Sequence, residues 1–390
     1  MSDSADDPIV IVGASAAGLT TAEALRRAGH AGPITMIGAE PHLPYDRPPL
    51  SKQVLAGTWE PERIALRDNP AYDKLDLDLR LGVAATGLDQ DSRTVRLSDG
   101  GEVRYADLVI ATGVHARKLN AGHDLAGVHV LRTLDDTLAL QADLARARSL
   151  VVIGAGFLGT EAAASATALG VAATVVDPLP VPMIRQFGAE IGGLVADLHR
   201  ERGVTMLLGT GVSQIYGTDR VQGVELADGR KLEADVVVVA IGSVPATHWL
   251  ADSGLDIGDG VRCDEFCRAA PHIYAAGDVA RWHNPLFGTD MRVEHRMNAT
   301  EQAIAVAANL LGTPTPFAPA PYFWTDQFDV KIQAYGMFPP EAEVTIAHGD
   351  PAERKFVAHY RRDGVIVGVL GWNMARQVRT DRGLVLERAR

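Results

Sequence analysis

Two glycine-rich loops, each followed by an acidic residue, are the parts of this sequence best suited to chemistry. The first lies in Ile9–Gly18 (IVIVGASAAG) and is followed by Glu40, and the second lies in Val151–Gly159 (VVIGAGFLG) and is followed by Asp177. A loop of this kind turns a buried strand into a helix whose N-terminus binds a pyrophosphate, and an acid about 20 residues further on accepts ribose hydroxyls. The sequence therefore predicts two dinucleotide sites.

The two loops differ at one position. The first has Ser15 where the middle glycine of the motif would stand, whereas the second has glycine at all three positions, Gly154, Gly156 and Gly159. The backbone approaches the pyrophosphate at the middle position, so a bulky side chain there would prevent binding. Serine is small, and its hydroxyl can donate to a phosphate oxygen. Both loops therefore remain compatible with a nucleotide.

Asp177 bears on the choice of nicotinamide cofactor. A carboxylate there accepts the hydroxyls of the adenine ribose and repels a 2′-phosphate, which favours NADH over NADPH. Arg185 is close enough in the sequence to bind a phosphate instead, or to form a surface ion pair. We expect NADH as the preferred donor.

The composition is that of a globular α/β enzyme with two or three domains. Of its 390 residues, 47% are hydrophobic, 22% charged and 6% aromatic, and the net charge of −12 argues against nucleic acid as a partner. The N-terminal sequence lacks the features of a signal peptide, and no apolar run could span a bilayer. We expect a cytoplasmic protein that does not bind membranes, and the sequence leaves its oligomeric state open.

The chain has two cysteines, Cys263 and Cys267. This pair could be a redox dithiol or part of a metal site. It has no companion cysteines and lies far from both glycine loops, so we interpret the two as packed thiols, which fits a reducing cytoplasm. The histidines are scattered and no HExxH motif occurs, so no metal is expected.

The surrounding elements repeat one plan. In each half a strand, a glycine loop, a helix and a second strand follow one another, and a later buried strand ends in a short turn, at Ala111-Thr112-Gly113 and at Ala240-Ile241-Gly242. We expect Leu77–Leu81 to join the following strands in an antiparallel ribbon, and a helix over Ala189–Arg202. The proline-rich stretch Thr313–Pro321 marks a linker to a small α+β C-terminal domain.

Several separated motifs resemble those of a known family. They are GASAAG, LPYDRPPLSK, LRTLDD, GAGFLGTEAA, YAAGDVA, VEHRMNAT and WTDQF. Together they resemble the oxygenase-coupled NAD(P)H–ferredoxin reductases, the putidaredoxin reductase-like flavoproteins. The resemblance runs through nearly the whole chain and implies a glutathione reductase-like α/β fold with two Rossmann-like domains.

The resemblance also implies which cofactor each domain binds. Residues 1–114 and 245–318 would form a discontinuous FAD-binding domain, residues 115–244 an NAD-binding domain, and residues 319–390 the C-terminal domain. The FAD side would include Gly13, Ser15, Ala17, Gly18, Glu40, Arg47, Lys52, Ala111, Thr112, Gly113, Arg132, Gly277, Asp278, Glu294, His295 and Trp324. The NAD side would include Gly154, Gly156, Phe157, Leu158, Gly159, Glu161, Asp177, Arg185 and Gly242.

The family pattern gives three residues a catalytic role. Lys52 would lie beside the flavin, where a cation stabilises the reduced anionic ring. Glu161 would point towards Lys52 and the nicotinamide carboxamide, and Trp324 would pack beside the isoalloxazine. Structural alternatives remain open for several of these residues. Glu161 could simply favour the positive end of a helix, Trp324 could be core, Arg47 and Arg132 could form surface ion pairs, and Asp278 could be an N-cap.

The lack of a suitably placed dithiol favours one mechanism. In relatives that use a disulfide, the redox cysteines follow the first glycine loop, and Pro44–Lys52 contains none. Hydride from NADH would therefore leave FAD as single electrons, to a [2Fe–2S] ferredoxin that supplies a cytochrome P450 or another oxygenase. The alternatives are a rubredoxin reductase, an NADH oxidase-type flavoenzyme, and a non-catalytic flavoprotein related to apoptosis-inducing factor.

A docking surface for the acidic ferredoxin is the remaining expectation. The chain is acidic overall, so local cations would have to attract the partner. We expect some of them among Arg292, Arg296, Arg361, Arg362, Arg376, Arg379 and Arg382. The alternative is that these side chains form an ordinary solvated face.

Overall fold

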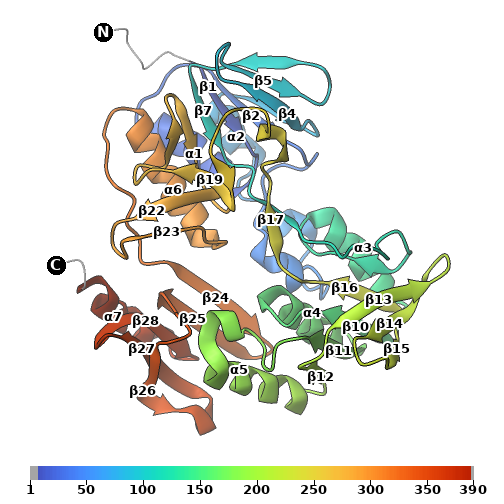
Figure 1. Cartoon of the computed structure of the whole chain (residues 1–390). Coiled ribbons are helices and arrows are strands. Elements are labelled where there is room, and N and C mark those ends of the chain that lie inside the picture. The colour runs from blue at the N-terminus through green and yellow to red at the C-terminus, as the bar shows by residue number, and fades with distance from the viewer. Residues whose placement is uncertain (1–7, 388–390) are drawn as a thin grey trace. The chain divides into compact units, whose positions relative to one another are not determined.

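A computed structural model describes residues 8–387, which fold into two compact units (Figure 1). The first unit is built from residues 8–46, Ile64–His115 and Val244–Pro321. The second is built from Arg47–Arg63, Ala116–Ser243 and residues 322–387. The segment Arg47–Arg63 groups with the second glycine loop, although in the sequence it follows the first.

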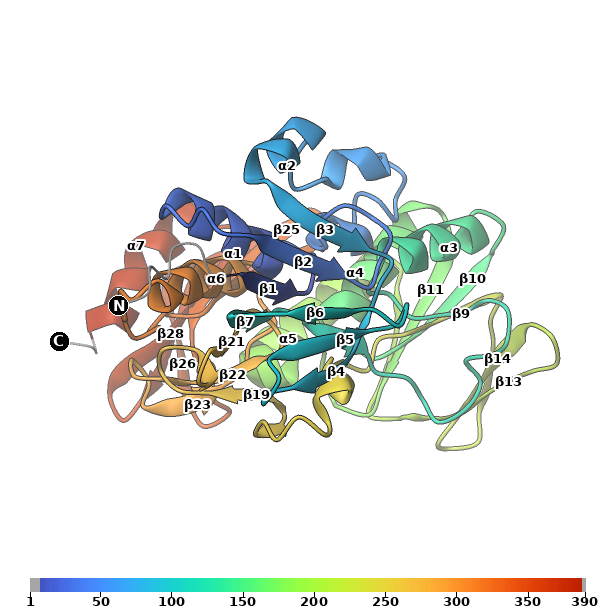
Figure 2. The ribbon, with the colours of Figure 1, turned by 90° about the horizontal axis from the view of Figure 1, so that it is seen from above.

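A mainly parallel sheet forms the core of the first unit. Its strand order is β20-β21-β7-β1-β2-β3, with β1 (Ile9–Val12) between β2 (Ile34–Gly38) and β7 (Asp107–Ile110). Every residue of β1 is buried, as is typical of a central parallel strand covered on both faces. Two helices, α1 (Ala16–Arg27) and α6 (Arg296–Leu310), pack side by side (Figure 2). The glycine loop joins β1 to α1, as predicted.

One predicted pairing in this unit is wrong. Leu77–Leu81 forms β3, which pairs in parallel with β2 in the main sheet instead of joining the antiparallel ribbon. Its alternating sequence fits a half-buried strand of either kind, so the pattern could not identify the neighbour. The ribbon consists of β4 (Ala85–Asp89), β5 (Thr94–Leu97) and β6 (Glu102–Arg104). The remaining elements of this unit are α2 (Asn69–Leu75), η3 (His248–Leu250), β18 (Ile257–Gly258), β19 (Gly260–Cys263), β20 (Arg268–Ala270), β21 (Ile273–Ala275), β22 (Ala280–Asn284) and β23 (Thr289–Met291).

The second unit repeats the strand–loop–helix plan around a five-stranded sheet. Its order is β12-β11-β10-β16-β9, and β10 (Ser149–Ile153) leads through the second glycine loop into α4 (Phe157–Ala168). The other strands are β9 (Val128–His129), β11 (Ala172–Asp177), β12 (Thr205–Leu208) and β16 (Val236–Val239). Further elements are η1 (Pro48–Ser51), α3 (Leu134–Leu144), β13 (Val212–Gly217), β14 (Val221–Leu226) and β15 (Lys231–Glu233). Three short elements span the segment boundaries: η2 (Pro61–Ile64), β8 (Val114–Ala116) and β17 (Ser243–Pro245).

The helix predicted at Ala189–Arg202 begins earlier in the structure. α5 covers Ile184–Glu201, and its regular part starts after Gly188, whose φ of 82° and ψ of 176° are not helical. Glycine adopts this conformation without the steric cost of a Cβ, so the break and the predicted start coincide. One face of α5 is buried and the other is solvated. Between Pro8 and Glu387, no helix has both the length and the apolar character that crossing a membrane requires.

The C-terminal part of the second unit is a five-stranded antiparallel sheet with one helix against it, which confirms the predicted α+β class. The strand order is β24-β25-β28-β27-β26, and α7 (Ala375–Leu386) packs on β25 and β28 (Figure 1). The strands are β24 (Tyr322–Gln327), β25 (Val330–Gly336), β26 (Glu343–Asp350), β27 (Lys355–Arg362) and β28 (Val365–Trp372), with η4 (Pro351–Glu353) between β26 and β27. Buried aromatic rings such as Phe356 and Trp372 fill its core.

Candidate active site

The first glycine loop is closely packed at two glycines. A Cβ at Gly13, which has φ +125°, would lie 2.1 Å from the carbonyl oxygen of Ala111, and one at Gly18 would lie 1.8 Å from that of Gly13. Only glycine fits at either position. Ser15 is the N-cap of α1, and its side chain makes no capping hydrogen bond within residues 8–387. The first-turn N–H groups of α1 are therefore not capped by Ser15, which suits a pyrophosphate.

The residues predicted around this loop lie at strand ends of the same sheet. Glu40 follows β2, and its carboxylate accepts a hydrogen bond from the hydroxyl of Tyr45. Thr112 follows β7 and donates from Oγ1 to the carbonyl of Ala246 at 2.9 Å, while Gly113 takes a φ of 68°. These side chains come from the carboxyl ends of parallel strands, which is where α/β folds bind ligands.

Gly277 is held by a side chain that the sequence did not single out. The N–H of Gly277 donates to Oε1 of Gln302 at 2.9 Å, and Nε2 of Gln302 lies 3.3 Å from Sγ of Cys267. Cys263 and Cys267 are both free and buried, and burial raises the pKa of the Cys267 thiol to about 12. The pair therefore has the packed character expected of it, because a neutral buried thiol is a poor nucleophile.

The VEHRMNAT segment enters α6 and carries paired charges. Arg292 donates to the carboxylate of Glu294 at 2.8 Å and to the backbone carbonyl of Asp278 at 3.1 Å. Arg296 contacts Asp46 and donates to Thr300 at 2.6 Å. His295 is the N-cap of α6, and burial lowers the pKa of its imidazole, which is therefore neutral at neutral pH. Both arginines are engaged in ion pairs within the first unit.

In the second glycine loop, the outer glycines and the middle glycine are needed for different reasons. Added Cβ atoms at Gly154 and Gly159 would lie 2.3 Å from the carbonyl of Ala240 and 2.0 Å from that of Gly154. At Gly156, by contrast, a Cβ would meet no described atom within 4 Å. The outer glycines are thus required by packing, whereas the middle one is open on the side from which a ligand can approach.

Asp177 anchors this loop from the end of β11. Its Oδ2 accepts from the N–H of Ala155 at 2.7 Å, and its Oδ1 accepts from that of Leu179 at 2.8 Å. Each carboxylate oxygen can accept a second hydrogen bond, so ribose hydroxyls remain possible ligands. Of the other predicted residues, Phe157 packs against Phe187 and Phe323, with ring centroids 5.5 and 5.3 Å away. Leu158 packs at the edge of the domain core, Gly242 takes a φ of +100°, and Arg185 is exposed on α5.

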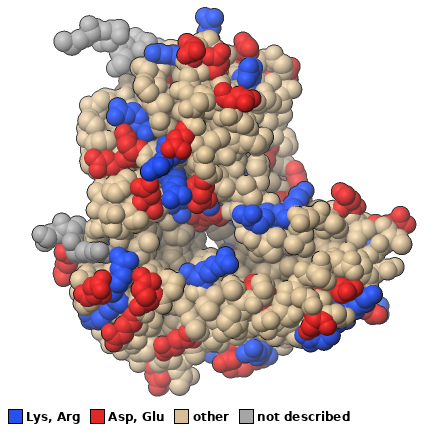
Figure 3. Space-filling model, viewed as in Figure 1, with Lys and Arg blue, Asp and Glu red and all other residues tan. Residues whose placement is uncertain are grey.

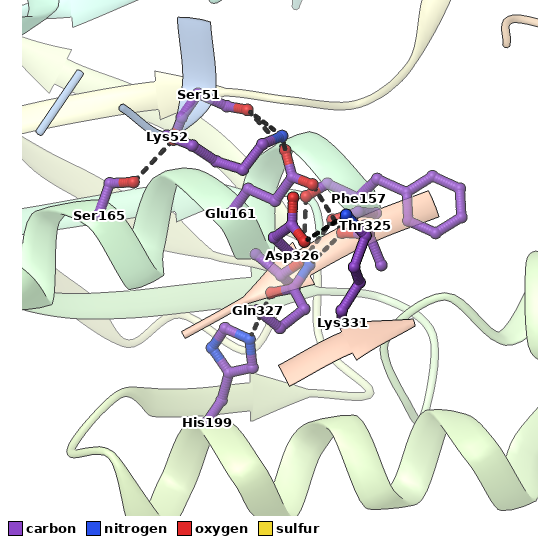
Figure 4. A network of polar contacts seen from close by, with 12 residues as sticks. Ser51, Lys52, Phe157, Glu161, Ser165, His199, Thr325, Asp326, Gln327 and Lys331 are labelled. Atoms are coloured by element: carbon purple, nitrogen blue, oxygen red, sulfur yellow. Dashed lines mark hydrogen bonds and ion pairs between the residues drawn. The ribbon is translucent and has the colours of Figure 1, made fainter. Parts of the chain in front are cut away.

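Glu161 is the polar centre of the second unit. Its side chain is buried near the start of α4, and Oε2 accepts from Nζ of Lys52 at 2.8 Å and from Oγ of Ser51 at 2.5 Å (Figure 4). Oε1 accepts from Oγ1 of Thr325 at 2.6 Å. The pairing of Lys52 with Glu161 expected from the resemblance is thus present. Helix α4 carries this carboxylate, and residues of the η1 segment and of strand β24 donate hydrogen bonds to it.

The polar network continues from Thr325 along β24. Nε2 of Gln327 donates to Oγ1 of Thr325 at 2.8 Å and to Oγ1 of Thr160 at 3.0 Å. Oγ1 of Thr160 lies within hydrogen-bonding distance, at 3.0 Å, of the carbonyl oxygen of Gly156. Buried hydrogen bonds therefore connect the second glycine loop with Glu161 through the C-terminal domain.

His199 of α5 closes the network. Its Nε2 lies 2.9 Å from Oε1 of Gln327, an oxygen that only accepts, so Nε2 carries the hydrogen. Burial lowers the pKa of His199 to about 4, which keeps the ring neutral at neutral pH. Nδ1 is then a bare lone pair, and it has no partner among the described residues. Every donor in the chain from His199 through Gln327 and Thr325 points towards Glu161.

The remaining predicted residues of this unit lie around the network. Nη1 of Arg47 donates to the backbone carbonyl of Arg132 at 2.8 Å, so these two residues are brought together. Trp324 stacks on Tyr322 with a centroid distance of 6.0 Å and an interplanar angle of 24°. Successive strand residues face opposite sides, so Trp324 points away from the face that carries Thr325.

Thr160, His199, Ser51, Thr325 and Gln327 belong to this network and were not singled out in the sequence. Ser51 and Thr325 both donate to Glu161, and Gln327 connects Thr325 to His199. A signal was available for two of them. Thr325 and Gln327 are polar residues two apart in WTDQF and therefore share one face of a strand. Trp324 belongs to the same motif, and the alternation of side chains along a strand places it on the opposite face from Thr325 and Gln327.

Comparisons with known proteins identify the family of the chain. The sequence matches the pyridine nucleotide-disulphide oxidoreductase family over residues 7–303 and the reductase C-terminal family over residues 322–390. The chain therefore belongs to the pyridine nucleotide-disulphide oxidoreductases, flavoenzymes that use FAD and a pyridine nucleotide. Membership confirms an oxidoreductase built from dinucleotide-binding domains and a separate C-terminal domain.

Individual relatives are reductases of oxygenase systems. The ferredoxin–NAD(+) reductase component of the anthranilate 1,2-dioxygenase system from Burkholderia cepacia is 40% identical, over 97% of this chain and 94% of its own length. The ferredoxin reductase for the CYP199A2 system from Rhodopseudomonas palustris is 37% identical, with a TM-score of 0.93 over 97% of this chain and 94% of that one. The reductase in a covalent putidaredoxin reductase–putidaredoxin complex is 32% identical, with a TM-score of 0.94 over 98% and 93%.

The buried network should carry measurable stability. Replacing Gln327 by leucine removes the acceptor for His199 and the donor to two threonines while filling similar space. Because unsatisfied buried polar groups cost free energy, we expect the free energy of unfolding to fall by about 2–3 kcal/mol. Urea unfolding of the flavin-loaded chain measures it.

Gln333→Leu is the matched control. Gln333 lies on the adjacent strand β25, is 9% exposed where Gln327 is 0% exposed, and donates to the hydroxyl of Tyr322 at 2.7 Å outside the network. Its loss should be about 1 kcal/mol. Equal losses for the two variants would show that the network adds nothing beyond single hydrogen bonds.

Proposed function

We propose that this chain is an FAD-dependent NADH:ferredoxin reductase that supplies electrons to an oxygenase, either a cytochrome P450 or a dioxygenase. The observation that carries the proposal is chemical. Two dinucleotide loops occur in a chain whose only two cysteines are buried, free thiols with a raised pKa. Electrons therefore have no dithiol to pass through, and a one-electron protein acceptor is the natural outlet.

The first loop fits FAD as a permanent ligand. Gly13 and Gly18 admit no side chain, Ser15 leaves the N-terminus of α1 uncapped, and Glu40 stands at the end of the next strand. Gly277, held by Gln302, would bind the central part of the cofactor at another strand end. Bound FAD would supply hydride acceptance and one-electron release, and the protein would supply position and electrostatics.

The second loop fits NADH. Gly156 is open to a pyrophosphate, and the carboxylate of Asp177 is fixed by Ala155 and Leu179 with acceptor capacity left for ribose hydroxyls. Its negative charge disfavours a 2′-phosphate. Arg185 is exposed on α5 and is a cation close to Asp177 in the sequence that could favour NADPH.

Lys52 and Glu161 would orient the reacting groups. The carboxylate of Glu161 fixes the ammonium of Lys52, which we propose lies beside the flavin ring and stabilises its reduced form. The three donors to Glu161 leave this carboxylate little rotational freedom, so its position is set before any ligand binds. Trp324, on the opposite face of β24, would pack beside the ring.

Rapid mixing tests the proposal. In the flavin-loaded chain, anaerobic NADH should bleach the yellow flavin band. The kcat/KM for NADH should be at least about tenfold above that for NADPH, because the carboxylate of Asp177 repels a 2′-phosphate. Each NADH should then reduce two equivalents of a [2Fe–2S] ferredoxin. If rubredoxin accepted the electrons faster than ferredoxin, the related rubredoxin reductase activity would be favoured. Peroxide as the main product, with no acceleration by ferredoxin, would contradict the proposal.

For the ferredoxin we propose a docking surface that includes α7. Arg376, Arg379 and Arg382 are exposed on this helix, whereas Arg292 and Arg296 are engaged in ion pairs. On the face shown in Figure 3, basic and acidic side chains are interspersed over each unit, so a short row of arginines is a local feature. Such a row would steer an acidic partner without a large basic patch.

Charge reversal tests this surface. The variant Arg376→Glu/Arg379→Glu should raise the KM for ferredoxin by about fivefold or more and flatten its dependence on salt, with the KM for NADH unchanged. Arg230→Glu is the control, because Arg230 is exposed and already paired with Asp228 on a hairpin of the NAD domain. An unchanged KM for ferredoxin in the double variant would exclude α7 from the interface.

A further inference from the structure

Three potential metal ligands converge at one point of the C-terminal domain. His348 comes from β26, His359 from β27 and Asp381 from α7. Oδ2 of Asp381 lies 3.2 Å from Nε2 of His348 and 2.7 Å from Nε2 of His359, and the three ligand atoms all lie within 4.8 Å of one another. Two imidazoles thus meet on a single carboxylate oxygen.

The carboxylate of Asp381 is held in place. Nε2 of Gln377, one turn earlier on α7, donates to Oδ1 of Asp381 at 2.8 Å, which leaves Oδ2 to the two imidazoles. The fold therefore fixes the carboxylate with one of its oxygens facing both imidazoles.

The cluster is closed on one side and open on the other. Asp381 is 5% exposed and His359 is 8% exposed, whereas the side chain of His348 is 43% exposed. An ion could enter past His348 and would find its other two ligands already fixed by the fold. The exposed side faces solvent, which can supply a water molecule as a further ligand.

We propose that His348, His359 and Asp381 bind one divalent transition-metal ion of the Zn²⁺ type. Two imidazole nitrogens and one carboxylate oxygen are ligands that Zn²⁺ takes, with a water in the fourth position. With bonds of about 2.0–2.1 Å, tetrahedral geometry places ligand atoms about 3.3 Å apart. The distance from Nε2 of His348 to Oδ2 of Asp381 is already close to this value. The distance from Nε2 of His359 to the same oxygen would increase by about half an ångström.

The ion would have a structural role that is independent of both glycine loops. β26 is one of the two edge strands of the sheet and is largely exposed, and α7 is the last helix within residues 8–387. A metal bound to both would tie this edge strand to the helix. Binding to the folded chain alone would stabilise it by mass action. Such a site was not expected from the scattered histidines of the sequence, because its three ligands come together only in the folded domain.

Zinc titration tests the site. The flavin-loaded full-length chain, without a polyhistidine tag and washed with a chelator, is titrated with ZnCl₂ in a calorimeter, and its Tm is measured with and without Zn²⁺. We expect one Zn²⁺ per chain and a Tm raised by several degrees, with no response to Mg²⁺, which prefers oxygen ligands. His348→Ala should weaken Zn²⁺ binding by at least about tenfold and abolish the Tm shift.

A control variant makes the outcome decisive. His348 is exposed, so His348→Ala keeps the buried contact of His359 with Asp381 and should fold. His283→Ala is the matched control, because His283 is also exposed and lies 3.1 Å from Asp290 but belongs to no three-ligand group within residues 8–387. It should bind Zn²⁺ as the unaltered chain does. No binding by the unaltered chain, or equal affinity in His348→Ala and His283→Ala, would overturn the proposal. Neither result bears on ferredoxin reduction.

Discussion

The burial of the Glu161 carboxylate is the constraint on which the second unit depends. A charge removed from water is tolerated only when a counter-charge and hydrogen bonds replace the lost hydration. Lys52 supplies the charge, and Ser51 and Thr325 supply the hydrogen bonds. Together with Glu161 itself, these partners come from three separate stretches of the sequence. The hydrogen bonds and the counter-charge that this one carboxylate requires therefore fix the η1 segment, α4 and β24 relative to one another.

The same polar chain links the C-terminal domain to the second glycine loop. Gln327 and Thr325 on β24 connect His199 to Glu161, and Thr160 brings the chain to the carbonyl of Gly156. Oε1 of Gln327 only accepts, so His199 donates to it from Nε2, and the amide group of Gln327 sets the direction of the hydrogen bonds. Strand β24 thus holds Glu161 in position through Thr325 and also carries Trp324.

The glycine loops could be predicted from the sequence because their requirements are local. Gly13 and Gly154 each face a carbonyl at the end of a neighbouring strand, and the strand–loop–helix pattern predicts both loops. Pairings between distant residues could not be predicted in this way. Leu77–Leu81 alternates like any half-buried strand, and its parallel partner β2 is chosen by the fold. Ser51 and Thr325 lie 110 and 164 residues from Glu161, so no local spacing identifies them as its partners.

The coupling between Lys52 and Glu161 tests the central claim most directly. In a double-mutant cycle, Lys52→Met, Glu161→Gln and the double variant are unfolded in urea as flavin-loaded chains. Each single change leaves a mostly buried charged group without its partner, whereas the double variant removes both. We predict that the double variant loses about 2–3 kcal/mol less than the sum of the two single losses. Losses that add within about 0.5 kcal/mol would contradict the claim that this buried pair holds the unit together.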